Sequence, residues 1–175
     1  NFVISAQSDF FGETYRIATK TVNVSLSSAP LSLRILVNDE SDYHDARLGE
    51  TLRYRLIYRN NSSVNFQDMT IRAALIGDMY DFGALQSQGS FNSITNKITW
   101  NTANVSDLKM IGPGEERSVE FTIKLKDQFP IARLGDKNYL VKVQSEIESP
   151  IVPPGVSAAK TISLANSEVK LRGVL

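Results

Sequence analysis

The sequence has no cysteine, one histidine and one tryptophan among its 175 residues. Without cysteine there are no disulfides, thiolate nucleophiles or sulfur-ligated metals, although many extracellular bacterial domains also lack this residue. Net charge is missing as well, because 19 Lys and Arg balance 19 Asp and Glu. No field of one sign would then draw the chain to nucleic acid or anionic lipid, so we expect neither as a partner.

Long apolar runs are also absent. Runs such as Ala73-Ala74-Leu75-Ile76 fall far short of the roughly 20 residues that cross a bilayer, so we expect no membrane insertion of this segment. The sequence opens on Asn1-Phe2-Val3-Ile4 with no initiator methionine or signal-peptide pattern, which indicates a piece of a longer polypeptide. A hydrophobic fraction of 42% is enough to build a sizeable core.

Alternation of apolar and polar residues is the dominant pattern, and helical spacing is nearly absent. Turn formers such as Asn60-Asn61-Ser62-Ser63 and Gly112-Pro113-Gly114 separate the alternating segments. Strands of this length with such turns predict an all-β, immunoglobulin-like antiparallel sandwich, with Trp100 as a plug between its sheets. The predicted core-facing sets are Leu31 to Val37, Leu52 to Tyr58, Met69 to Leu75, Ile98 with Trp100, Val119 to Leu125, Val141 to Ile147, and a closing strand from Val156 to Leu164.

Three matches between the two ends of the chain, in the same order, suggest a tandem repeat of about 137 to 140 residues. On this interpretation residues 1–30 are the last two strands of a preceding repeat or a strand-donating arm, residues 31–165 are one complete repeat, and residues 166–175 are a linker and the start of the next. The matches pair Asn1–Ser8 with Asn138–Ser145, Ala18–Val22 with Ala158–Ile162, and Leu31–Arg34 with Val169–Arg172.

The segment Leu48-Gly49-Glu50-Thr51-Leu52-Arg53-Tyr54-Arg55-Leu56-Ile57-Tyr58-Arg59-Asn60-Asn61-Ser62 resembles a family of conserved repeat domains of unknown function, found in tandem in bacterial and archaeal cell-surface proteins. Ile98-Thr99-Trp100-Asn101 and the turn Gly112-Pro113-Gly114-Glu115 also resemble that family. The resemblance covers most of residues 31–165 but not Tyr80 to Phe91. It implies an Ig-like sandwich displayed outside the cell as a stalk, adhesin or envelope component, with no catalytic residues to carry over.

The densest cluster of oxygen ligands is the loop around His44. Calcium is the specific hypothesis for this loop, because carboxylates at alternate positions can converge on a hard cation. The simpler alternative is a solvated loop at one end of the sandwich. Catalysis through His44 is not expected, since no serine lies on a Gly-x-Ser-x-Gly elbow, and we predict neither a catalytic residue nor a cofactor. The calcium candidates are Asp39, Glu40, Asp42 and Asp45.

Two further groups suggest ligands. Tyr80, Phe82 and Phe91 would suit a carbohydrate platform if exposed, although packing in the core or at an edge is the simpler alternative. Arg53, Arg55 and Arg59 form a basic stripe that would suit an acidic glycan, or else a solvated sheet face.

The sequence therefore predicts a non-catalytic structural repeat, a spacer or stalk, in an extracellular or cell-envelope protein. Its partners would be neighbouring repeats or identical subunits. Two alternatives stay open. One is a self-assembling filament subunit that uses residues 1–30 for strand complementation. The other is an adhesive or carbohydrate-binding module.

Overall fold

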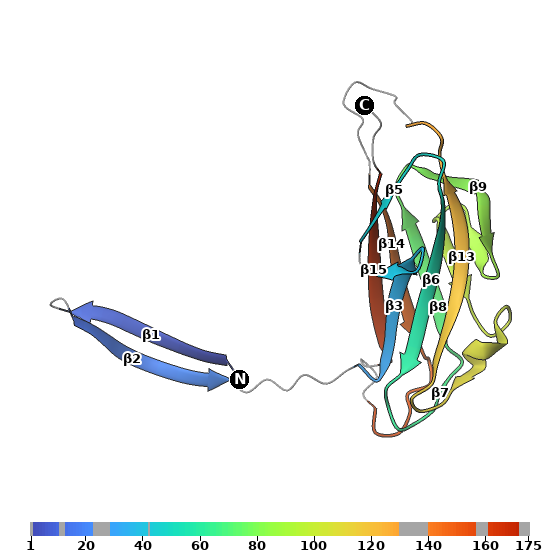
Figure 1. Cartoon of the computed structure of the whole chain (residues 1–175). Coiled ribbons are helices and arrows are strands. Elements are labelled where there is room, and N and C mark those ends of the chain that lie inside the picture. Colours follow the sequence, from blue (N-terminus) through green and yellow to red (C-terminus); the bar gives the residue numbers. More distant parts are fainter. Residues whose placement is uncertain are drawn as a thin grey trace.

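The computed structural model describes residues 2–10, 13–22, 29–41, 43–129, 140–156 and 161–171. The described residues from Leu31 onward build two large packed sheets (Figure 1). No helix among these described residues is long and apolar enough to span a membrane. One sheet has five strands, in the order β4 (Glu40–Ser41), β3 (Leu31–Val37), β6 (Thr51–Asn60), β13 (Glu116–Leu125) and β9 (Tyr80–Ser87). The other has six, in the order β10 (Ser90–Asn92), β11 (Lys97–Trp100), β8 (Thr70–Ile76), β14 (Leu140–Glu148), β15 (Ile162–Leu171) and β5 (Tyr43–Ala46).

Three smaller elements complete the described chain. The short strands β7 (Phe66–Gln67) and β12 (Met110–Ile111) pair with each other, and the single turn of 3₁₀-helix η1 (Ser106–Lys109) precedes β12. The N-terminal strands β1 (Phe2–Phe10) and β2 (Glu13–Val22) form a separate two-stranded antiparallel sheet.

The core lies between the two large sheets, and the alternation predicted from the sequence is confirmed there. Alternate residues of β3, β6, β8, β13 and β14 are buried, as strand geometry requires when one face meets a partner sheet. Trp100 is fully buried, and its ring centroid lies 6.0 Å from that of Phe121 in the opposite sheet. Phe121 in turn stacks on Tyr54 at 4.7 Å. The predicted role of Trp100 as a plug between the sheets is therefore confirmed.

The chain between Leu31 and Ala46 contributes strands to both sheets. β3 pairs antiparallel with β6, from Leu31 opposite Asn60 to Val37 opposite Tyr54. Asn38 and Asp39 then turn the chain with positive φ angles of 49° and 68°, which Asn and Asp tolerate better than most residues. After the short β4, the chain changes sheets, and β5 pairs parallel with the final strand β15.

The final strand differs from the sequence prediction. The pattern placed it from Val156 to Leu164, whereas β15 runs Ile162–Leu171 and pairs with β14 along its length; residues 157–160 lie outside the described residues. Ser167, Val169 and Leu171 are its buried positions, and β5 holds this half in the sheet. Residues 166–171 are thus part of the sandwich, where the sequence pattern indicated a linker.

The two terminal hairpins do not share the register that the sequence matches suggest. The matches align Val3 with Leu140 and Thr21 with Thr161, and Val3 pairs with Thr21. In the second hairpin the position opposite Leu140 is Lys170, not Thr161. The third match relates β3 to the end of β15, two strands in different sheets. The tandem repeat therefore stays a prediction.

Candidate functional site: a polar clasp at the entry and exit strands

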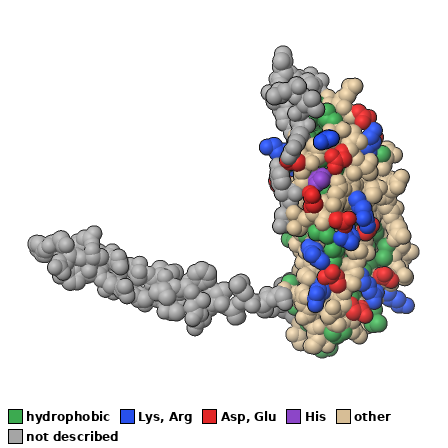
Figure 2. Space-filling view, in the orientation of Figure 1, with side chains coloured by type: hydrophobic (Ala, Val, Ile, Leu, Met, Phe, Trp, Pro, Cys, Tyr) green, Lys and Arg blue, Asp and Glu red, His purple; other side chains and the backbone are tan. Residues whose placement is uncertain are grey.

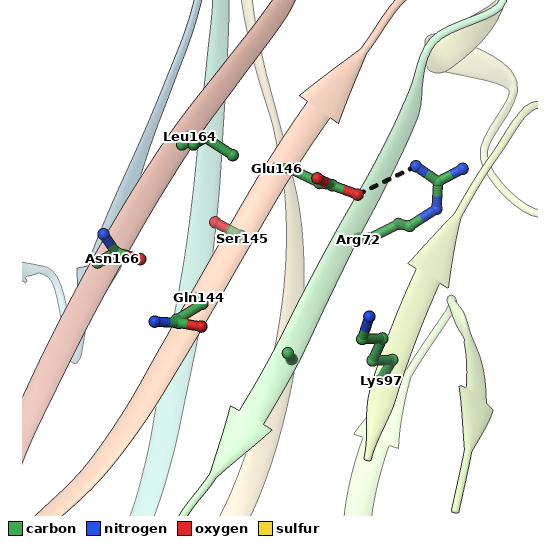
Figure 3. A pocket seen from close by; sticks show the side chains of 8 residues that line it. Arg72, Lys97, Gln144, Ser145, Glu146, Leu164 and Asn166 are labelled. Atoms are coloured by element: carbon green, nitrogen blue, oxygen red, sulfur yellow. Dashed lines mark hydrogen bonds and ion pairs between the residues drawn. The ribbon is translucent and has the colours of Figure 1, made fainter. Parts of the chain in front are cut away.

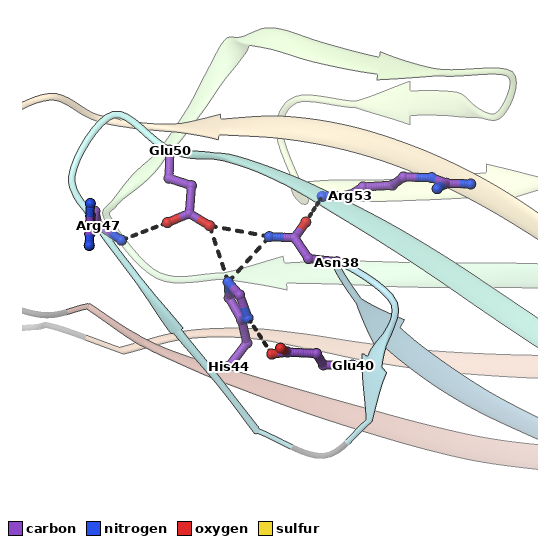
Figure 4. A network of polar contacts seen from close by, with 6 residues as sticks. All are labelled: Asn38, Glu40, His44, Arg47, Glu50 and Arg53. Atoms are coloured by element: carbon purple, nitrogen blue, oxygen red, sulfur yellow. Dashed lines mark hydrogen bonds and ion pairs between the residues drawn. The ribbon is translucent and has the colours of Figure 1, made fainter.

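His44 lies in β5, opposite Val169 of β15, and both of its ring nitrogens face carboxylates (Figure 4). Nδ1 is 2.8 Å from Oε2 of Glu40, and Nε2 is 3.1 Å from Oε1 of Glu50. The amide nitrogen of Asn38 lies 3.2 Å from both Nε2 and the same Glu50 oxygen. We call these four side chains, Asn38, Glu40, His44 and Glu50, the His44 clasp.

The clasp also binds the backbone at two turns. The side-chain oxygen of Asn38 accepts a hydrogen bond from the Arg53 N–H at 2.9 Å, at the start of β6. The second oxygen of Glu50 accepts one from the Arg47 N–H, also at 2.9 Å. Gly49 precedes Glu50 with a φ of +74°, and a Cβ there would collide with the side chain of Asp127. One network thus joins the β3–β4 turn, the sheet-changing strand β5 and the beginning of β6.

The electrostatics of the clasp favour a charged imidazole. Burial of the ring opposes protonation, but the hydrogen bonds and charges of Glu40 and Glu50 outweigh it and raise the pKa of His44 above its ordinary value. For Glu50, burial acts to raise the pKa, but the Arg47 N–H and the His44 ring together lower it. The side chain of His44 is only 13% exposed, so solvent screens its pair with Glu50 less than a surface pair.

The acidic loop does not gather its described carboxylates around a common point. Asp39 pairs with Arg55 at 2.7 Å and with Arg53 at 3.5 Å, while Glu40 faces His44. Asp45 lies in β5 opposite Lys170. Among the described residues no three His, Asp or Glu side chains form a group that could hold a metal ion. Asp42 lies outside the described residues, so calcium at this loop stays a prediction.

The basic stripe on β6 is interleaved with acidic residues of its neighbours. Arg53 forms hydrogen bonds with Glu120 of β13 at 2.9 to 3.1 Å, and Arg55 pairs with Asp39. Arg34 of β3 likewise pairs with Glu116 at 3.1 Å. These cross-strand pairs balance the charge locally, which leaves Arg53 and Arg55 poorly suited to attract an anionic polymer.

The predicted aromatic platform is not formed by all three rings. Tyr80 is buried at 1% exposure, and its hydroxyl lies 2.9 Å from that of Tyr54 in the core. Phe82 and Phe91 stack on each other at 5.5 Å and pack half-buried against the core. For Tyr80 the simpler alternative, packing in the core, is therefore confirmed, because β9 turns this residue toward the opposite sheet.

Similarity to known proteins is confined to structure. No family model matches the chain, and no curated protein sequence matches it significantly. Native E. coli alpha-2-macroglobulin has a TM-score of 0.51 and 12% identity over 97% of this chain, which corresponds to 8% of that protein. The fold is an immunoglobulin-like β-sandwich.

Two smaller structures are also similar. One is the CARDB domain of a Pyrococcus furiosus protein, solved with di-metal ions, with a TM-score of 0.45 and 12% identity over 86% of this chain and 95% of that one. The other is a type I cohesin from Pseudobacteroides cellulosolvens, with a TM-score of 0.45 and 13% identity over 83% and 94% of the two chains.

Sequence reasoning found His44 but missed its partners Asn38 and Glu50. A signal was present for each. Asn38-Asp39 directly after the apolar alternation of Leu31 to Val37 is typical of a tight turn with positive φ angles. Glu50 follows Gly49 three residues after Arg47, a spacing at which a carboxylate can accept a hydrogen bond from the backbone N–H. Nothing in the sequence places both beside His44, because that depends on β5 changing sheets.

We predict that His44→Gln lowers the free energy of unfolding by about 1 kcal/mol, and most strongly between about pH 4.5 and 6.5. The stabilisation from a histidine with a raised pKa is complete below its unfolded pKa and is lost as pH rises through the folded value. Glu50, with a lowered pKa, contributes above its unfolded pKa and loses its contribution as pH falls through the folded value. Urea unfolding across this range measures the difference.

Two controls accompany this experiment. Because His44 is the only histidine, its ring proton signals in an NMR pH titration report its pKa directly and should show it raised. Glu116→Gln removes the ion pair with Arg34, which contacts no residue of the clasp, and its loss of unfolding free energy should not change through the pH range in which histidine titrates. If the loss of unfolding free energy caused by His44→Gln does not change with pH, the proposed role of the clasp is wrong.

Proposed function

We propose that the chain is a non-catalytic spacer domain of an extracellular or cell-envelope protein, and that it carries tension along its long axis. The observation that carries this proposal is the placement of its entry and exit strands. β3 begins at one end of the sandwich and β15 finishes at the other (Figure 1). Copies joined in series through these strands would extend end to end, which suits a stalk.

The pairing of these strands supports a mechanical role. β5, which continues from β3, pairs parallel with β15 from Tyr43 opposite Glu168 to Ala46 opposite Leu171. Tension applied at Leu31 and Leu171 pulls two parallel segments in opposite directions along their axes. The hydrogen bonds between them are then loaded together in shear, not opened one at a time. The His44 clasp fixes β5 to the β6 side of the sandwich beside this ladder.

The surface of the five-stranded sheet also fits a spacer. Basic and acidic side chains alternate over the face that carries β3, β6 and β13 (Figure 2). An evenly mixed surface keeps a domain soluble and discourages contact with charged polymers. We infer that its partners are neighbouring repeats or identical subunits.

Proline substitutions in β5 test the shear ladder. Along an edge strand, successive backbone N–H groups point alternately toward and away from the neighbouring strand, and proline removes the N–H. Only one of the two variants Asp45→Pro and Ala46→Pro removes an N–H that points toward β15. We expect that variant to unfold at a clearly lower force than the other. Single-molecule force spectroscopy through the chain ends measures this.

A variant matched in stability separates mechanics from thermodynamics. Ile98→Ala truncates a buried side chain in β11, away from the entry and exit strands, and should cost about 2–4 kcal/mol of unfolding free energy. At a similar loss of free energy, the β5 variant should lower the unfolding force more. An equal drop in force for both would argue against the mechanical role.

The N-terminal hairpin favours a second candidate function. β1 and β2 pair with each other and, among the described pairings, with no strand of the sandwich. An isolated two-stranded sheet is at best marginally stable in water. We infer that residues 1–30 pack with another copy or another repeat, which would make the chain a filament subunit.

Mass photometry of the full chain beside a chain that starts at Leu31 distinguishes the two candidates. If the hairpin joins copies, only the full chain forms ordered oligomers, and their size grows with protein concentration. If both chains stay monomeric, the filament candidate fails and the spacer proposal is untouched.

A further inference from the structure

The outer face of the six-stranded sheet, turned away from the core, carries a hollow of about 320 Å³ (Figure 3). This volume lies at the lower end of the range for small-molecule sites, about 300–1,000 Å³. The side chains that line the hollow come from four strands. They are Arg72 and Ala74 of β8, Lys97 of β11, Gln144 and Glu146 of β14, and Leu164 and Asn166 of β15.

The strand register explains why a hollow forms here. Lys97, Ala74, Gln144 and Asn166 lie directly opposite one another across the four strands and form one row. Arg72, Glu146 and Leu164 form the adjacent row, two residues along each strand. Ala74 is the smallest member of either row. Its methyl group is therefore the floor, and the longer neighbouring side chains are the walls.

The polar side chains of the row that contains Ala74 make no hydrogen bond or ion pair with the described residues. The side-chain amides of Gln144 and Asn166 and the ammonium of Lys97 are exposed and have no hydrogen-bond or ion-pair partner among the described residues. Each amide offers two N–H donors and a carbonyl acceptor. Neighbouring strands are about 4.8 Å apart, so the two amides are spaced to bind adjacent polar groups of one ligand.

The charges of the second row are already balanced. Arg72 pairs with Glu146 at 3.2 Å and with Glu148 at 2.6 Å. These two carboxylates offset Arg72 and Lys97, so the face has no excess of either sign to hold an anion. Leu164, 70% exposed at the rim, adds an apolar surface beside the amides. A neutral ligand with many hydroxyl groups and an apolar C–H face matches this combination.

We propose that this hollow, which we call the amide face, is a binding site for a neutral saccharide. Hydroxyls of the sugar bond to the amides of Gln144 and Asn166 and to the Lys97 ammonium, while its C–H face lies on Ala74 and Leu164. A peptide strand is a poorer fit, since it would need the backbone edge of a sheet and this hollow lies on the face. The site does not depend on the spacer proposal, because a stalk needs no ligand.

NMR titration of the full ¹⁵N-labelled chain tests the amide face. The probes are chitotriose, cellotriose and mannotriose, with trigalacturonic acid as the charged comparison. We expect at least one neutral trisaccharide to shift the side-chain amide signals of Gln144 and Asn166 saturably. Asn166→Ala and Gln144→Ala should each weaken that binding about tenfold, the effect expected from losing a hydrogen-bonding group.

The matched control is Gln86→Ala, which removes an exposed glutamine from β9 on the other sheet and should leave the affinity unchanged. Three results would overturn the proposal. One is the absence of saturable shifts with every neutral probe, and another is binding of the acidic trisaccharide alone. The third is shifts at the amide face that follow protein concentration without sugar, which would identify the face as a contact between copies.

Discussion

The parallel pairing of β5 with β15 is the constraint on which the rest of the structure depends. It requires the chain to leave the five-stranded sheet after β4, at Ser41, and to join the six-stranded sheet at Tyr43. The left-handed turn at Asn38 and Asp39 reverses the chain from β3 into β4 just before that change of sheet. The His44 clasp then secures the crossing segment. The position of Leu171 in the core follows, because β5 is its neighbour in the sheet.

Most of the sandwich could be predicted from the sequence because burial on one face imposes a period of two. Val119 to Leu125 and the Trp100 plug are examples. The segments that were missed or displaced obey other constraints. β9 contains Gly83 and a register shift against β13, so its alternation is broken. β15 could not be placed because its buried half is set by β5, a strand of four residues with no apolar period.

The candidate sites were harder to predict than the fold for a related reason. Carboxylates close together in the sequence suggested a calcium loop, yet Asp39 turns to the arginines of β6 and Glu40 to a histidine. The amide face has no sequence signature at all. Lys97, Gln144 and Asn166 come from three separate strands and meet only through the register of the six-stranded sheet. Both outer faces carry ion pairs, but the amides of Gln144 and Asn166 on the six-stranded sheet have no partner among the described residues.

The direction dependence of mechanical unfolding tests the central claim most directly. Because the chain has no cysteine, handles can be attached at cysteines introduced at exposed positions, either at Ala29 and Lys170 or at Ser90 and Lys170. The first pair loads the β5–β15 ladder in shear, whereas the second pulls across the six-stranded sheet, from its edge strand β10 to β15. We expect a clearly higher unfolding force for the first pair. Equal forces in the two directions would contradict the account.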